Sequence, residues 1–151
     1  MRRILVIHST SDPGVDDRIA AMAKKPELAE CEFHHATFIR PEDAEELSQL
    51  KPSEFLRHNE LKLFRRINGQ IEAEKPEMVV LHSGIAFSIA PQTVMSIFSM
   101  LKTRHPQLKF AIQENATLNH LLESQGGYFT RQIDEIFDRG PEIKNIVKLM
   151  F

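Results

Sequence analysis

The sequence predicts a three-layer α/β domain with a mostly parallel sheet of four or five strands. Two short runs, residues 4–7 and 78–81, are apolar at every position, which is typical of central parallel strands buried on both faces. Segments with helical spacing of apolar residues separate these runs from two further predicted strands, residues 31–38 and 108–112. Strands that alternate with helices in this way favour a parallel sheet.

The length and composition predict one domain spanning residues 1–151, of which 42% are hydrophobic and 26% charged. The formal net charge of −2 is too balanced for non-specific binding to nucleic acid, so we expect no such partner. The single cysteine cannot form an internal disulfide, and the first residues do not read as a secretory leader. We therefore expect a cytoplasmic location.

The helices before the third strand are delimited by proline and glycine. The first begins near Gly14 and ends before Pro26. The following crossover is long: residues 42–50 predict a short helix, and residues 52–74 carry apolar side chains at spacings of three, four and seven. A basic run within this second stretch, residues 57–66, is interpreted as a solvated helix face or a groove for an anion or partner.

The helices after the third strand are less regular. Pro91 suits the first turn of a helix that extends to Leu101. Residues 118–123 predict another helix, which two glycines interrupt before helical spacing resumes at residues 129–137. Residues 141–151 fit either a last helix or a fifth strand.

The segment 78–101 contains no charged residue, which by length alone would permit a membrane span. Polar residues interrupt it, so we expect a strand, a loop and an amphipathic helix, and no membrane partner. Its helical part has more apolar positions than one inward stripe needs, including Met95 and Met100. That surplus predicts a homodimer.

Right-handed crossovers give the strand order 2-1-3-4, which is that of flavodoxin-like and receiver-like folds. Ligands of such sheets bind beyond the carboxyl ends of the strands, where the order reverses. The two neighbouring central strands each end in His-Ser, so His8 and His82 could reach one ligand as acid–base groups. The alternative is that these are ordinary polar strand ends. The candidates are His8, Ser9, Thr10 and Asp12 after the first strand, His82, Ser83 and Gly84 after the third, and Gln113, Glu114 and Asn115 after the fourth.

The loop after the first strand carries Asp12, Asp16 and Asp17 within six residues. Carboxylates at this density repel one another unless a cation screens them, and oxygen ligands suit Ca²⁺ or Mg²⁺. In the other interpretation Asp-Pro-Gly forms a turn, the two later aspartates favour the helix dipole, and no metal binds. We expect no organic cofactor, because the sequence contains neither G-x-G-x-x-G nor G-x-x-x-x-G-K-[ST].

Residues 4–21 resemble the N-terminal aspartate signature of the inosine–uridine nucleoside hydrolases, D-x-D-P-G-x-D-D after the first strand. The resemblance implies calcium-dependent cleavage of an N-ribosidic bond, in which Asp12 holds the metal and activates its water. Asp17 would be a second ligand, and Asp16 would bind ribose hydroxyls. Thr10 stands where the signature has its first aspartate, and no His-Asp dipeptide matches the family's later metal ligand.

These patterns predict a small-ligand-binding protein that acts at the carboxyl ends of the first, third and fourth strands. Its predicted chemistry is hydrolysis of a nucleoside-like or hydroxyl-rich molecule, with His8, His82 and Asp12 catalytic. The alternative is a non-catalytic, receiver-like or scaffold domain that binds partners through its helix faces.

Overall fold

The computed structural model describes residues 2–10, 14–82 and 89–151. Four strands in this part of the chain form one parallel sheet in the order β2-β1-β3-β4. The fold class, the strand order and the central pair are thereby confirmed, since Ile4 of β1 pairs with Met78 of β3 in parallel register. The strands are β1 (Arg2–Thr10), β2 (Cys31–Ile39), β3 (Met78–Leu81) and β4 (Lys109–Ile112).

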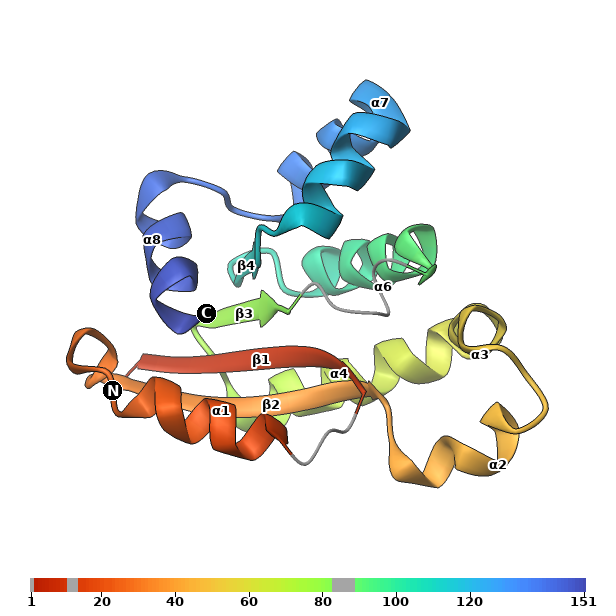
Figure 1. The fold of residues 1–151 in the computed structure, drawn as a ribbon, viewed down its shortest axis with the longest axis horizontal. Helices are drawn as coiled ribbons and strands as arrows, with labels where there is room; N and C mark the ends of the chain where they lie inside the picture. Colours follow the sequence, from red (N-terminus) through yellow and green to blue (C-terminus); the bar gives the residue numbers. More distant parts are fainter. Residues whose placement is uncertain (1, 11–13, 83–88) are drawn as a thin grey trace.

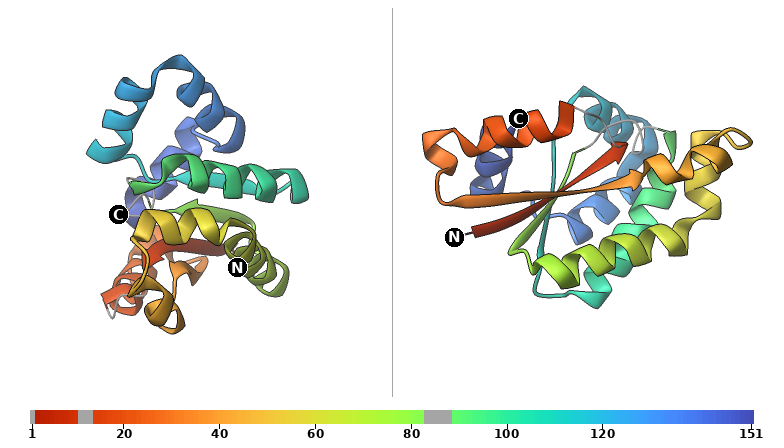
Figure 2. Two further views of the ribbon diagram at one scale, coloured as in Figure 1. Left: turned by 90° about the vertical axis from the view of Figure 1, so that its right-hand side faces the viewer. Right: turned by 90° about the horizontal axis from the view of Figure 1, so that it is seen from below.

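Helices cover both faces of the sheet (Figure 1). Seen from below, α1 and the C-terminus lie on one side of the strands, and α4 and α6 lie on the other (Figure 2, right). The first face is covered by α1 (Gly14–Ala23), η1 (Pro26–Leu28) and α8 (Pro141–Met150). The second is covered by α3 (Pro52–His58), α4 (Glu60–Glu74), α6 (Pro91–Arg104) and α7 (Ala116–Ile136).

Alternation along the strands divides the core into two clusters. Leu5 and Ile7 of β1 point toward α4 and α6 in the larger cluster. Ile4 and Val6 point the other way and pack with Met22 of α1 and with α8. Because side chains alternate strictly along a strand, this parity decides which helices face every polar residue near the strand ends.

The long crossover differs in detail from its prediction. Two short elements, η2 (Pro41–Asp43) and α2 (Ala44–Leu47), follow β2. The predicted helical stripe is two helices, α3 and α4, separated at Asn59, whose φ of −105° and ψ of 18° are not helical. The Asn59 amide donates hydrogen bonds of 2.9 Å to the Phe55 carbonyl and to Glu46 Oε1, which holds the break in place.

The last third of the chain resolves the alternative that the sequence left open, because residues 141–150 form helix α8 and bury Ile143, Val147 and Met150. The predicted glycine break lies inside α7, where Gly126 has φ 76° and ψ −170°. The bend between the two arms of α7 lies away from the sheet (Figure 1), while both arms bury side chains in the larger cluster.

The apolar surplus of α6 is largely used within the chain. Met95 is 2% exposed, and Met100 packs partly against the same core as Val94 and Phe98. The observation that motivated the dimer prediction is therefore accounted for by packing inside one chain. Among the described residues, no helix is long and apolar enough to cross a membrane.

Candidate functional site

Three histidines from three adjacent strands lie in one row on the α1–α8 face. His8 continues the inward alternation of Ile4 and Val6, and His82 continues that of Met78 and Val80. His35 of β2 pairs in register with Val6. The ring of His8 lies 5.2 Å from that of His82 and 6.3 Å from that of His35, measured between centroids. We call these three residues the histidine row.

The neighbouring His34 points to the opposite face, as expected for successive residues of a strand. Its ring nitrogens lie 3.0 Å from Glu32 and 3.2 Å from Glu74 of α4. His34 is thereby separated from the histidine row by the sheet itself.

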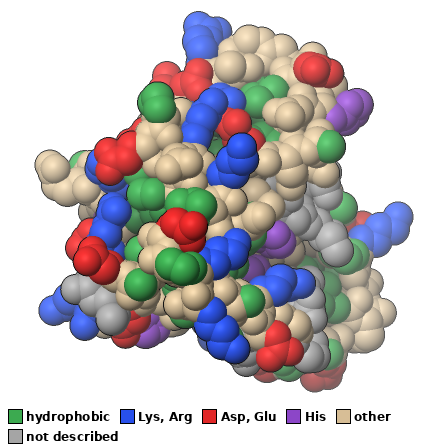
Figure 3. Space-filling model, turned by 60° about the vertical axis from the view of Figure 1, so that its left-hand side comes forward, with side chains coloured by type: hydrophobic (Ala, Val, Ile, Leu, Met, Phe, Trp, Pro, Cys, Tyr) green, Lys and Arg blue, Asp and Glu red, His purple; other side chains and the backbone are tan. Residues whose placement is uncertain are grey.

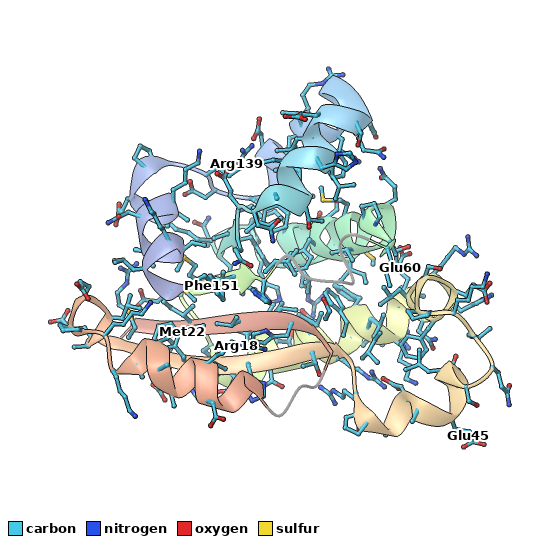
Figure 4. The ribbon with its side chains drawn as sticks, in the orientation of Figure 1. Arg18, Met22, Glu45, Glu60, Arg139 and Phe151 are labelled. Carbon is cyan, nitrogen blue, oxygen red and sulfur yellow. The ribbon has the colours of Figure 1, made fainter. Side chains whose placement is uncertain are left out.

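Phe151, directly after α8, covers the row at β3. Its ring stacks on His82 with a centroid distance of 4.9 Å and an interplanar angle of 23°. Phe151 and the α1 residues Arg18 and Met22 lie on the same side of the sheet (Figure 4). The end of α8 is held there by a hydrogen bond of 2.5 Å from Lys25 Nζ to the Leu149 carbonyl. His8 is only 3% exposed beneath these groups, whereas His82 is partly exposed.

Burial, and next the positive charge of Arg18, lower the pKa of His82 below its ordinary value of 6.5. The neutral imidazole is therefore favoured at neutral pH. A neutral imidazole has one nitrogen that can accept a proton or a hydrogen bond, and this is the state that a general base requires.

A cavity of about 430 Å³ adjoins the row between α8 and the carboxyl end of β4. Phe151 belongs both to the cavity wall and to the stack on His82, so its ring connects the two features, although His82 itself is not among the lining residues. The volume falls in the range of roughly 300 to 1,000 Å³ that is common for small-molecule sites. We call it the α8 cavity, and its lining residues are Ile112, Gln113, Glu114, Lys144, Val147, Lys148 and Phe151.

Glu114 is fixed at the wall of the α8 cavity by two cations. Its Oε1 lies 2.7 Å from Arg139 Nε and 3.6 Å from Lys144 Nζ. Arg139, which lies between α7 and α8 (Figure 4), also pairs with Asp134 at 2.9 Å. In Figure 3, histidine side chains near the centre of the molecule are bordered by Lys and Arg side chains. Around Glu114 the described cations are Arg139 and Lys144, and Lys148 lies in the same cavity lining.

The structure brings some predicted residues to this site and gives others local roles. Ser9 is buried at 8% exposure in β1, but strand alternation turns it to the face of Leu5 and Ile7, opposite His8. The side-chain oxygen of Gln113 is buried, and its backbone N–H donates to the Leu81 carbonyl at 2.9 Å. Asn115 caps α7 by accepting a hydrogen bond of 2.9 Å from the Leu118 N–H. Asp17 is exposed on α1.

Several predicted residues lie outside what the structure describes. These are Asp12, Ser83 and Gly84, together with the side chains of Thr10 and Asp16. Among the side chains that are described, no group of three or more His, Cys, Asp or Glu is arranged to hold a metal ion.

A larger cavity of about 800 Å³ lies at the opposite, amino edge of the sheet, near His105 and Lys109. Two of its polar lining groups already have partners, since Arg2 pairs with Glu77 of the same cavity at 3.4 Å and His105 bonds Asn68 at 2.6 Å. Ligands of parallel sheets bind at the carboxyl edge, so we assign the candidate site to the α8 cavity and the histidine row.

Sequence reasoning missed His35, Lys144, Lys148 and Phe151. The sequence pattern does not assign His35 to a face, because Phe33 and Phe38 of the same strand pack on opposite sides of the sheet. The lysines could have been found from residues 141–151 as a helix, since Lys144 and Lys148 are four apart beside the apolar stripe.

Comparisons of the chain with protein-family models, with curated proteins and with solved structures return no match.

Proposed function

We propose that this protein binds a small, hydroxyl-rich or nucleoside-like molecule in the α8 cavity, beside the histidine row. The observation that carries the proposal is the continuity of the two features through Phe151, which lines the cavity and stacks on His82. A concave pocket with one aromatic wall and a few polar groups is the usual form of a small-ligand site.

Within this proposal the reaction class is hydrolysis. Of the two central imidazoles we assign the base to His82, because His82 is partly exposed whereas His8 is only 3% exposed. In its neutral form His82 removes a proton from water as the water oxygen bonds to carbon and the bond to the leaving group breaks. The proton then passes to the leaving group. His8 adds a second imidazole to the polar edge of the site, 5.2 Å from His82 between ring centroids.

The acidic loop after β1 would supply the ligands of a metal ion. Asp12 and Asp17 would hold Ca²⁺ or Mg²⁺, and Asp16, Thr10, Ser83 and Gly84 would contact hydroxyl groups of the ligand. Calorimetric titration of chelator-treated protein tests this directly. Binding tighter than about a millimolar that disappears in Asp12→Asn supports the metal. If neither Ca²⁺ nor Mg²⁺ gives a heat of binding, the metal ion is removed from the proposal.

A thermal-shift panel of nucleosides, nucleotides and sugars, with and without Ca²⁺ and Mg²⁺, tests ligand binding. A ligand at 100 times its Kd stabilises the folded protein by about 2.7 kcal/mol, which is a shift of several degrees. Hydrolysis is then tested by release of reducing sugar from compounds that bind. A flat response across the panel contradicts the proposal and favours the scaffold alternative.

Self-association and a cytoplasmic location stay proposals as well. A homodimer would have to use a surface other than the buried stripe of α6. Light scattering at tens of micromolar tests it, and a monomeric mass contradicts it.

A further inference from the structure

The charges around the α8 cavity are unequal, and the imbalance indicates what kind of molecule the cavity accepts. Its lining holds one carboxylate, Glu114, and two ammonium groups, Lys144 and Lys148. Glu114 is already compensated by Arg139 at 2.7 Å and by Lys144 at 3.6 Å. Lys148 forms no ion pair with any residue of the described ranges. One positive charge at the wall is therefore left for a ligand.

The two lysines stand on one side of α8. They are four residues apart, so they are neighbours on the helix surface, where like charges repel. Lys148 lies in the last turn, and the helix dipole favours a cation there. The helix dipole explains why a lysine is tolerated at position 148. Both ammonium groups also border the same cavity, and this arrangement suits an anion that binds between them.

The aromatic ring of Phe151 indicates how a ligand would lie in the cavity. Phe151 closes one side of the cavity with its ring, and the same ring rests on His82. A ligand held at the lysines by an anionic group would therefore lie with its body along Phe151 and toward the imidazole of His82.

We propose that the ligand of the α8 cavity carries an anionic group, a phosphate ester or a carboxylate, which Lys148 binds together with Lys144. This inference rests on the proposed function and narrows its ligand class. Phosphate esters and carboxylates share the chemistry that an ammonium group recognises, and the experiment separates them.

The test compares matched pairs of compounds by calorimetry at low salt. Adenosine is paired with adenosine 5′-monophosphate, ribose with ribose 5-phosphate, and glucose with glucuronate. We expect the charged member of at least one pair to bind about ten-fold more tightly than its neutral partner. Tighter binding of the phosphates identifies a phosphate ester, and tighter binding of glucuronate identifies a carboxylate.

Lys148→Gln is expected to remove this preference, because it weakens binding of the charged partner about ten-fold relative to the neutral one. Lys148 is exposed, so the substitution leaves the core intact. The matched control is Lys109→Gln, an exposed lysine beside the cavity at the amino edge, which should keep the preference. A merely structural role for Lys148 would lower the melting temperature of the free protein and leave the ratio of the two affinities as it was.

Equal affinity for charged and neutral members, unchanged in Lys148→Gln, overturns this inference and leaves the proposed function standing. Failure of every compound to bind at millimolar concentration overturns both.

Discussion

Replacing Asp43 by asparagine should remove a buried ion pair that fixes the chain after β2. Asp43 is 3% exposed and receives hydrogen bonds of 2.8 and 2.7 Å from Arg66 Nη1 and Nη2. The Arg40 backbone N–H adds a third, at 2.9 Å. Arg66 also donates to the Phe38 carbonyl at 3.3 Å, so the pair connects α4 to the end of β2 at the carboxyl edge of the sheet.

The size of the effect follows from the pKa of Asp43. The hydrogen bonds from Arg66 lower the pKa of this carboxyl from its ordinary 3.8 to about 2, although burial alone would raise it. At about 1.4 kcal/mol for each pH unit, the difference corresponds to roughly 2 to 3 kcal/mol in favour of the ionised form. Asp43→Asn should lower the free energy of unfolding by that order at pH 7, because Arg66 keeps its charge and loses its partner.

The assay is urea unfolding of the wild type and of Asp43→Asn between pH 7 and pH 2. Because the folded-state pKa is the lower one, the wild-type advantage is complete above pH 3.8 and disappears as the pH falls toward 2. Glu45→Gln is the matched control, since Glu45 is an exposed carboxylate in the adjoining α2 (Figure 4). A loss of stability no larger than that of the control, or one that does not change with pH, would show that the Asp43–Arg66 pair does not stabilise the fold.

Three further stability predictions concern the site and the C-terminal third. The folded-state pKa of His82 is lowered, so the wild type should lose stability relative to His82→Gln as the pH falls below 6.5. Urea unfolding between pH 8 and 5 checks this. A difference in unfolding free energy that stays constant over this range contradicts it. Asn115→Ala should cost about 1 kcal/mol in thermal unfolding, because the Leu118 N–H loses its cap; a neutral result would show that the cap is dispensable. Gly126→Ala should destabilise the protein by about 1 kcal/mol or more, because the φ of 76° at this position disfavours a side chain. The control Gly127→Ala should stabilise it, because alanine favours a helix more than glycine does. Changes of the same sign in the melting temperatures of the two variants would contradict the kink at Gly126.

The fold was predictable because its signals are local and redundant. The apolar runs at residues 4–7 and 78–81 are typical of strands buried on both faces, and right-handed parallel crossovers favour the strand order that the structure has. The boundary between α3 and α4 was not predictable, because both helices share one apolar stripe and the break depends on the side chain of Asn59.

The site was predictable only in part. The convergence of His8 and His82 follows from parallel neighbours, and their rings do lie 5.2 Å apart. The contribution of His35 depends on the register of β2, which periodicity does not set. The partners of Glu114 depend on where α8 docks, since Arg139 and Lys144 are 25 and 30 positions away along the chain. Arg66, interpreted from the basic run as solvated, instead pairs with a buried carboxylate, a long-range contact that charge patterning does not contain.

Titration of ¹³C-histidine-labelled protein with adenosine 5′-monophosphate, followed by NMR of the imidazole signals, tests the site assignment most directly. The protein offers its own internal control, because His82 adjoins the α8 cavity and His105 lies at the larger cavity of the amino edge. We expect saturable shifts of the His82 signal that are weakened in Lys148→Gln, and no change of the His105 signal. Shifts confined to His105, or no shift of His82 at millimolar nucleotide, would contradict it.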